Sequence, residues 1–524
     1  MAKWQNYLNT HDTRGTRHRP RSALEVLALV RGAAAAGTKI RAVGSGHSSS
    51  EVARPVEGQA WVDLSKMDDV LEWPWYADPS AASRYVRVEA GITIAELNER
   101  LDEMRPPRAL YNMGNYDGQT LAGAFSTGTH GSGLNHGPIG DRVVAIEMVT
   151  DEKLPSGARA QRLLRLEPED GAVTDPAAFA AEHASFGGED DPVRQMVLER
   201  DDEAFAAALI NLGCLGIVTA VTVETRERFW LEERETHHTW DQVGDTVEDP
   251  ATLAAQHPEF LQITLSPHAV EREEGEGAKV HCLVTSRAEI PVPDDEEPTS
   301  RDPSWMARWV AAIFSSGALE NFGLWFPRTA LKSFANNFAR RAERSAEDPH
   351  RSVSWEVLVT SLGPEVDGTS CEIFVPLDRA KAALDRIVEL AAEKETLDGH
   401  MDALEWFHTS PLGVRTVAQS EALLAPSFDG PKVAIEVQLL YDLSELPWER
   451  VKHDRYRDRM LETLVTELCA EPYGGRPHWG QRHWMTDARA QALYGDRWTR
   501  WKAQHARFDA YGTFANAFTA RMGL

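Results

Sequence analysis

Two glycine-rich segments, each with one histidine, hold the residues of this sequence best suited to chemistry. Residues Arg41 to Ser50 read RAVGSGHSSS, and residues Gly123 to Gly133 read GAFSTGTHGSG. In both, an apolar run meets small residues whose backbone N–H groups can close on a phosphate, while the histidine can stand beside a second ring. Two such loops in one chain predict a large bound cofactor.

Both loops also have a simpler interpretation. His47 in the first could merely cap a turn or hydrogen-bond a phosphate, and the glycines of the second could merely permit a tight turn with positive φ. A binding role is favoured for the second loop because Ser126, Thr127 and Thr129 interleave hydroxyl groups with the glycines. His130 in the same loop could shape it through a buried hydrogen bond.

The elements that must hold these loops follow from hydrophobic periodicity. Apolar residues recur at helical spacing from Ser22 to Ala35 and alternate like a strand from Lys39 to Val43, directly before the first loop. Further strands are predicted at Trp61 to Leu64, Tyr85 to Val88 and Val143 to Val149, and a further helix at Ile94 to Leu101. The N-terminal part is therefore predicted to mix helices and strands.

The second part of the chain has a different pattern. The run from Leu209 to Val223 ends in a β-branched strand and is predicted to close the first domain. From about Phe229 onward, long strands with helices between them predict an antiparallel sheet with helices on one face. The predicted strands are His257 to Leu265, Lys279 to Ser286, Val353 to Val359, Thr369 to Pro376 and Lys432 to Leu440, with a helix at Arg379 to Lys394.

Three further segments stand out by composition. Glu167 to Asp202 and Ile290 to Pro303 are acidic, contain Pro, and are predicted to be connectors or lids. The aromatic run from Trp305 to Phe326 could line an apolar pocket or a subunit interface, although such a stripe more often belongs to a core.

The overall composition fits a soluble enzyme of more than one domain. The chain has 524 residues, 42% of them apolar, which is enough for two substantial cores. Its 55 basic and 81 acidic residues give a net charge of −26, which disfavours nucleic acids and anionic membrane surfaces as partners. Its four cysteines form no CxxC pair, so neither a metal site nor a disulfide framework is indicated. Without a secretory signal or a run of about 18 apolar residues, the protein is expected to be cytoplasmic, with no membrane span.

Several motifs in a fixed order resemble the vanillyl-alcohol-oxidase-type flavoproteins. They are VGSGHSSS, VDLSKM, VRVEAGITIAELNERL, NMGNYDGQTLAGAFSTGTHGSG and GCLGIVTAVTV, followed near the C-terminus by GGRPHWG at Gly474 to Gly480. Within that group the chain is most similar to the branch of aldonolactone oxidases and alditol oxidases. The resemblance is strong over residues 20–225, moderate over residues 370–524 and weak from about residue 230 to residue 350.

The resemblance implies an α+β fold with a two-part FAD-binding domain of the PCMH type and a cap domain, whose large antiparallel sheet is covered by helices. It places the FAD-binding domain at residues 1–226, the substrate or cap domain at 227–470, and a C-terminal segment that returns to the flavin at 471–524. The implied cofactor is FAD, bound covalently through its 8α-methyl group to His47, because family members with histidine in the GHS position carry that bond. Such a bond would raise the reduction potential of the flavin.

The same resemblance assigns cofactor contacts residue by residue. A single covalent bond is expected, because YNMGNYDG lacks the cysteine of doubly tethered relatives. The positions that match the cofactor-binding loops are Gly44, Ser45, Gly46, His47, Ser48, Gly114, Asp117, Gly118, Thr120, Gly123, Ser126, Thr127, Thr129, His130, Gly131, Gly216, Ile217 and Val218.

Two residues are the predicted catalytic groups. Hydride transfer to flavin N5 needs a base for the substrate hydroxyl and donors that fix its oxygen. By the resemblance, Arg415 would stabilise negative charge on reduced flavin or on an alkoxide, and His478 could be the base or orient the hydroxyl. The alternatives are a surface arginine on a strand and a histidine that merely packs beside Trp479.

The sequence departs from the aldonolactone and alditol branch at two positions. Those enzymes place a glutamate two residues before the arginine and a lysine directly after HWG, where this chain has Gly413 and Gln481. Glu372 in CEIFVP or Glu436 in AIEVQ could supply the missing carboxylate. The weaker candidates for substrate contact are therefore Trp479, Gln481 and Glu372.

The expected function is that of an FAD-dependent oxidase. It would take hydride from the alcohol carbon of a sugar, polyol or lactone-like substrate and reduce O₂ to H₂O₂, so its partners are a small-molecule alcohol and O₂. Three alternatives stay open: a hydrophobic alcohol such as a sterol as substrate, an electron acceptor other than oxygen, and a flavoprotein without turnover.

Overall fold

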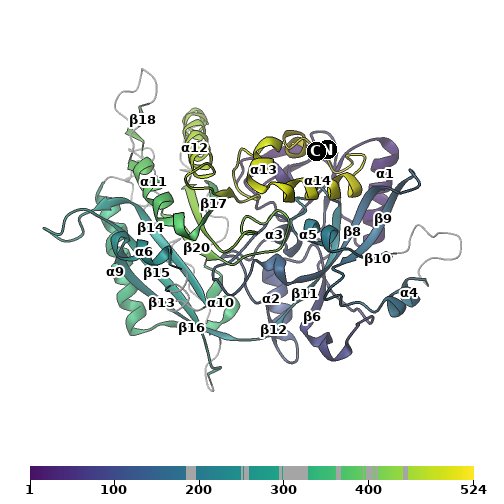
Figure 1. The fold of residues 1–524 in the computed structure, drawn as a ribbon, viewed down its shortest axis with the longest axis horizontal. Coiled ribbons are helices and arrows are strands. Elements are labelled where there is room, and N and C mark those ends of the chain that lie inside the picture. Colours follow the sequence, from purple (N-terminus) through teal and green to yellow (C-terminus); the bar gives the residue numbers. More distant parts are fainter. Residues whose placement is uncertain are drawn as a thin grey trace.

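The computed structural model describes residues 1–184, 196–249, 252, 259–293, 298, 328–360, 368–392, 395–396, 405–406, 411–440 and 447–524. The aromatic run from Trp305 to Phe326 lies outside the described residues, as do residues 294–297 and 299–303 of the second acidic segment. Figure 1 shows the described chain as two parts side by side, with the purple and blue N-terminal part on the right and the teal and green part on the left.

The N-terminal part begins with a four-stranded sheet in the order β1-β2-β4-β3. Its elements are β1 (Ala2–Gln5), β2 (Asp12–His18), α1 (Ala23–Ala36), β3 (Ile40–Val43) and β4 (Ala60–Asp63). The side chain of Ser22 caps the start of α1, and Gly37 ends it in the left-handed conformation, with φ of 65°. The predicted helix and the strand that precedes the first glycine-rich loop are thereby confirmed.

A six-stranded sheet, in the order β10-β9-β8-β11-β6-β5, follows in the same part. Its strands are β5 (Val70–Leu71), β6 (Tyr85–Glu89), β8 (Val143–Lys153), β9 (Arg159–Glu167), β10 (Met196–Arg200) and β11 (Ile217–Glu224). The helices are α2 (Ile94–Glu103), α3 (Leu121–Ser126), α4 (Pro176–Ala184) and α5 (Asp202–Ala208). The short strands β7 (Arg108–Ala109) and β12 (Arg226–Glu227) pair with each other.

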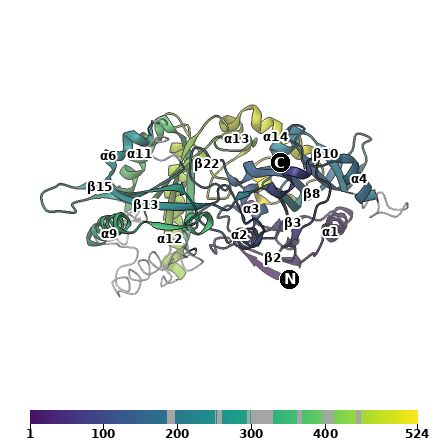
Figure 2. The same ribbon diagram turned by 90° about the horizontal axis from the view of Figure 1, so that it is seen from below.

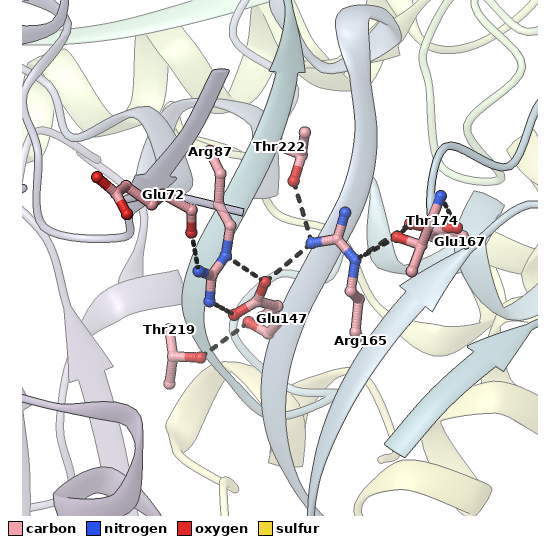
Figure 3. A network of polar contacts seen from close by, with 8 residues as sticks. All are labelled: Glu72, Arg87, Glu147, Arg165, Glu167, Thr174, Thr219 and Thr222. Atoms are coloured by element: carbon pink, nitrogen blue, oxygen red, sulfur yellow. Dashed lines mark hydrogen bonds and ion pairs between the residues drawn. The ribbon is translucent and has the colours of Figure 1, made fainter. Parts of the chain in front are cut away.

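A buried ion-pair network crosses four strands of this sheet, as Figure 3 shows. Glu147 on β8 accepts hydrogen bonds from Arg87 on β6 at 2.7 Å and from Arg165 on β9 at 2.9 Å. Arg165 also donates to Thr222 on β11 and to Glu167, each at 3.1 Å. Burial alone would raise the pKa of Glu147, but the two guanidinium groups lower it to about 2. The network therefore ties β6, β11, β8 and β9 together.

The second part is built on an eight-stranded sheet in the order β16-β13-β15-β14-β20-β21-β17-β22, in which all neighbouring strands run antiparallel. Its strands are β13 (Trp230–Thr239), β14 (Phe260–Val270), β15 (Lys279–Ile290), β16 (His350–Val353), β17 (Gly368–Pro376), β20 (Leu412–Val417), β21 (Lys432–Leu440) and β22 (Arg476–Pro477). The helices are α6 (Trp240–Val247), α9 (Arg328–Glu347), α10 (Ser354–Leu358), α11 (Ala380–Ala392) and α12 (Pro447–Leu468). A small separate pair is formed by β18 (Glu395–Thr396) and β19 (Glu405–Trp406).

One face of the eight-stranded sheet is apolar and the other is partly polar. Alternate residues such as Ile263, Val414 and Ile435 form a core with α6, α11 and α12. Figure 2 shows α6 and α11 on one side of β13 and β15, and α9 on the other. Because side chains alternate along a strand, Arg415 and Glu436 point to the face opposite this core.

The C-terminal helices pack on the N-terminal part. They are α13 (Asp487–Tyr494), α14 (Asp496–Phe508) and α15 (Ala517–Arg521), drawn in yellow in Figure 1. The indole N–H of Trp501 on α14 donates to the carbonyl oxygens of Ala207 and Ile210, at 3.2 and 3.0 Å. The division of the chain at residues 226 and 470 stays a prediction.

Two expectations from the sequence differ from the structure. The predicted strand from Val353 to Val359 is wrong: β16 ends at Val353 and helix α10 follows, burying Val357 and Leu358 in the N-terminal core. A short apolar run has no clear period, so tertiary packing decided its conformation. The segment from Glu167 to Asp202, expected to be a connector, contains α4 and strand β10, which extends the six-stranded sheet.

Among the helices that the structure describes, none combines the length and the apolar content that a membrane crossing needs.

Candidate functional site

A pocket lies where β3, the start of α3 and the turn before β11 meet. The pocket lining contains the following residues predicted to bind a cofactor: Gly44, Ser45, Gly46, His47, Ser48, Thr120, Gly123, Ser126, Thr127, Gly216 and Val218. Segments far apart in sequence thus supply one wall each, and the two glycine-rich loops face the same space.

At two positions of this lining, neighbouring atoms come so close that only glycine fits. A Cβ at Gly44 would lie 2.4 Å from Oγ1 of Thr120, and one at Gly216 would lie 2.5 Å from the carbonyl oxygen of Val149. Gly216 also has φ of 153°, in the region that favours glycine. The wall is therefore largely bare backbone, which suits a ligand with phosphate groups.

His47 is the histidine of the first loop, and the pocket wall includes it. Its Nδ1 is buried and has no hydrogen-bond partner among the described residues. Burial lowers the pKa of His47 to about 4, so the ring is neutral at pH 7. A neutral imidazole with an unused nitrogen is a competent nucleophile.

Sequence reasoning missed Arg41, which also lines the pocket. Its buried guanidinium donates to the carbonyl oxygens of Gly213 and Phe514, both at 2.8 Å, and of Leu212 at 2.5 Å. It therefore ties the first loop to the turn before β11 and to the C-terminal segment. The sequence feature that could have revealed Arg41 is an arginine inside an apolar strand. Such a cation is buried, so it needs hydrogen-bond partners from elsewhere in the fold.

The remaining predicted contacts do not line this pocket. They are Gly114, Asp117, Gly118, Thr129, His130, Gly131 and Ile217. Gly131 has a packing reason, since a Cβ there would lie 2.1 Å from Oδ1 of Asn112. Gly118 makes room for Tyr116, whose ring carbon Cζ would lie 2.5 Å from such a Cβ.

A second group of polar side chains lies on the partly polar face of the eight-stranded sheet. Glu372 on β17 and Glu436 on β21 stand opposite each other in register. Arg415 on β20 donates to Oε1 of Glu372 at 3.2 Å and to Oε2 of Glu436 at 2.9 Å. We call these three residues and Gln481 the carboxylate–arginine cluster.

Gln481 completes the cluster from the C-terminal loop. Its Nε2 donates to Oε1 of Glu436 at 3.2 Å and to Oε2 of Glu372 at 3.4 Å. Gly413 pairs with Glu436 across the strands, and a Cβ at Gly413 would lie 3.5 Å from its Oε2. Gly413, which stands where the related enzymes have a glutamate, therefore faces the carboxylate of Glu436 on the neighbouring strand.

The charges in the cluster are set by mutual contact. Burial would raise the pKa of Glu372, but His130 and Arg415 lower it to about 2. Burial would lower the pKa of Arg415, and the two carboxylates raise it. Nε of Arg415 and Oε1 of Gln481 are buried without a partner among the described residues, so the cluster has unused hydrogen-bonding capacity.

The two candidate histidines are held by the backbone. His130 lies 3.2 Å from Glu372 through Nε2 and 2.8 Å from the carbonyl oxygen of Gly131 through Nδ1. Nδ1 of His478 accepts a hydrogen bond from the amide of Gly480 at 3.0 Å, and the ring also bonds to the backbone of Gly128. Burial lowers the pKa of His478 to about 4. With both nitrogens engaged, His478 is suited to positioning the loop more than to taking a proton.

The C-terminal loop connects the cluster with the pocket. A Cβ at Gly480 would lie 3.2 Å from Oγ1 of Thr127, which lines the pocket, while the adjacent Gln481 belongs to the cluster. Trp479, the residue before Gly480, is fully buried, and its indole N–H donates to the carbonyl oxygen of Leu424 at 2.9 Å. This places Trp479 in the core and makes it an anchor for the loop.

Comparison with known proteins agrees with this arrangement. The sequence profile of the family described as D-arabinono-1,4-lactone oxidase matches residues 221–522, more than half of the chain. The chain belongs to this family. The profile described as FAD binding domain matches residues 17–153, which contain most of the pocket. The predicted family resemblance and FAD-binding domain are thus confirmed, and the protein is an FAD-dependent oxidoreductase that acts on CH–OH donors.

The alignments with individual relatives span nearly the whole of this chain. It is 25% identical to the L-gulono-1,4-lactone dehydrogenase of Mycobacterium tuberculosis, over 96% of this chain and 95% of that protein. It is 22% identical to the L-gulonolactone oxidase of Bos taurus, over 99% and 98%. Among solved structures, a solvent-stable cholesterol oxidase matches with a TM-score of 0.67 at 16% identity, over 100% and 97%, which confirms the predicted α+β fold.

Proposed function

We propose that this protein oxidises an alcohol carbon of a sugar lactone or a related polyol, with FAD covalently bound to His47 and O₂ as the electron acceptor. The observation that carries the proposal is the carboxylate–arginine cluster, which the loop of Gly480 and Gln481 joins to the wall of the FAD-binding pocket. Polar groups that can hydrogen-bond to a hydroxylated substrate therefore lie next to the proposed cofactor site.

The pocket fits FAD by its own features. Bare backbone at Gly44 and Gly216 allows phosphates to approach, and the unpartnered Nδ1 of His47 leaves a nucleophile in the wall. Bound FAD would supply the two-electron acceptor for the hydride. The hydroxyl groups of Ser126 and Thr127 are suited to hold its phosphate and ring oxygens.

Within the cluster, we assign the substrate contact to Arg415 and Glu436. The side chain of Glu436 is 12% exposed and that of Glu372 only 3%, so Glu436 is the carboxylate that a substrate can reach. Glu436 would accept the hydroxyl proton, and Arg415 would stabilise the developing alkoxide. Glu372, buried between His130 and Arg415, would orient the guanidinium.

The substrate class is supported by the relatives and by the cluster together. The relatives are named for gulono- and arabinono-lactones. Four hydrogen-bonding side chains on the sheet face match the several hydroxyl groups of such a substrate better than an apolar alcohol.

A substrate panel with two readouts tests the function. Aldono-1,4-lactones, alditols and a sterol are offered to the purified protein, and flavin bleaching without oxygen and peroxide formation in air are measured. Bleaching by a lactone with peroxide formation is the expected result. Bleaching without peroxide would make the protein a dehydrogenase, and no bleaching by any alcohol would overturn the proposal.

Acid precipitation tests the covalent bond. Yellow colour should stay in the pellet of the parent protein and of a His18→Ala control, and should move to the supernatant with His47→Ala. Colour released from the parent would remove the tether and leave dissociable FAD.

We also propose the domain division at residues 226 and 470 and a cytoplasmic location. The four cysteines are buried free thiols, as is usual in a reducing compartment.

A further inference from the structure

His47 packs against two tyrosine rings. The ring centroid of Tyr116 is 4.6 Å from that of His47 with an interplanar angle of 18°, and the centroid of Tyr7 is also 4.6 Å away, tilted by 59°. The two tyrosine rings are 5.6 Å apart, and the hydroxyl of Tyr7 bonds to Tyr116. The imidazole therefore stacks on Tyr116 and meets Tyr7 at a tilt, and the two tyrosines also contact each other.

The fold builds this arrangement from three separate segments. The backbone amide of Tyr7 donates to the carbonyl oxygen of Gly46 at 2.7 Å, and Nδ2 of Asn6 donates to that of Ser48 at 3.0 Å. The turn between β1 and β2 is thus fixed on both sides of His47. On the other side, Gly118 has no Cβ that would collide with the ring of Tyr116.

Neither tyrosine has a role in the cofactor contacts assigned above or in the proposed oxidation. Burial raises the pKa of Tyr7, and its hydrogen bond to Tyr116 raises it further, so its hydroxyl stays protonated and does not act as a base. What the pair does provide is restraint: an imidazole whose Nδ1 has no hydrogen bond would otherwise be free to rotate about its side-chain bonds.

We infer that Tyr7 and Tyr116 clamp the imidazole of His47 at the angle needed for its bond to FAD, and so are positioning residues for covalent attachment. The inference rests on the proposed tether. In the attachment, one ring nitrogen of His47 bonds to the 8α-methyl carbon. The methyl group and the imidazole each lose one hydrogen, and O₂ accepts both with two electrons to give H₂O₂. Fixing one reactant in a near-attack orientation accelerates such a step.

The test follows covalent and total flavin separately. Parent, Tyr7→Ala, Tyr116→Ala, Tyr7→Phe and Tyr76→Ala proteins are purified, incubated with FAD in air, and sampled over time for total bound flavin and for flavin retained in the acid-precipitated chain. Tyr76 is the matched control, because it is also half-buried and packs against an aromatic ring, that of Trp73 at 4.4 Å, away from the pocket. Tyr7→Leu and Tyr116→Leu replace the alanine variants if these do not fold.

We expect Tyr7→Ala and Tyr116→Ala to bind FAD but to attach it about tenfold or more slowly. Tyr7→Phe keeps the ring and should attach FAD at the parent rate, as should Tyr76→Ala. Parent-like rates in both alanine variants would overturn the clamp, as would a Tyr7→Phe protein as slow as Tyr7→Ala. A parent without covalent FAD would instead remove the tether itself, whether or not lactones bleach the flavin.

Discussion

At the scale of single residues, Arg415 is held between two carboxylates of unequal exposure. Glu436 is the more exposed and accepts from Arg415 at 2.9 Å. A Glu436→Gln variant should reduce its flavin with lactone about 100-fold more slowly, because the carboxylate that accepts the hydroxyl proton is lost. Anaerobic stopped-flow bleaching measures this rate. The control Glu421→Gln, with a side chain 81% exposed, should bleach like the parent; an unchanged rate in Glu436→Gln would contradict the assignment.

The same carboxylate can be moved to the opposite strand. Gly413 faces Glu436 in register, and a Cβ at Gly413 would make only ordinary van der Waals contacts. A Gly413→Glu/Glu436→Gln double variant should recover part of the activity lost in Glu436→Gln, because the carboxylate again lies beside Arg415. Steady-state kcat and KM compare the two. A double variant no faster than the single one, with FAD bound normally, would show that the position of the carboxylate on β21 is essential.

At the scale of elements, the Glu147 network holds the six-stranded sheet. Removing the shared carboxylate in Glu147→Gln leaves Arg87 buried without a carboxylate and Arg165 with Glu167 alone, which should destabilise the fold by about 3–5 kcal/mol. Urea unfolding measures the change. Glu203→Gln breaks the surface pair with Arg500 and should cost about 1 kcal/mol or less. Equal effects of the two variants would contradict a special role of the buried network in stability.

At the scale of the whole molecule, the C-terminal segment meets the N-terminal part at Asp509, whose backbone pairs with that of Asp151 on β8. The carboxylate of Asp509 accepts hydrogen bonds from the amides of Thr513 and Phe514, at 2.6 and 3.1 Å. Burial raises the pKa of Asp509 to about 7. The charge of Asp151 also raises this pKa, whereas the two amide hydrogen bonds and Lys39 lower it. The folded chain keeps this proton up to about pH 7, whereas the unfolded chain loses it near pH 3.9. The unfolded state then binds fewer protons, so this group's contribution to stability falls as pH rises through that window and is constant above it.

An Asp509→Asn variant should therefore lose this slope. The difference in free energy of unfolding between parent and variant should change by up to about 1.4 kcal/mol per pH unit between about pH 4 and pH 7, in the direction of a less stable parent at pH 7. Denaturant titrations at several pH values measure it, with Asp496→Asn as a surface control. A difference that does not depend on pH would show that Asp509 is ionised in the folded protein.

Local sequence patterns determined the loops and most of the elements around them. The N-cap Ser22, the terminating Gly37 and the strand before Gly44 are short-range features, since capping and alternation depend on neighbouring residues alone. The two glycine-rich loops and their histidines could be recognised for the same reason. The helix α10 could not, because Val357 and Leu358 are buried by contacts with distant parts of the chain.

The tertiary structure alone decided which of the predicted residues act together. Glu436 stands beside Arg415, and Gln481 bridges both carboxylates, because strand register and the C-terminal loop bring residues 372, 415, 436 and 481 to one sheet face. Tyr7 meets His47 only because the first hairpin folds over the loop. A sequence contains the chemical groups and their local conformations, but side-chain contacts between distant segments depend on packing, and these contacts determine charge, burial and reactivity.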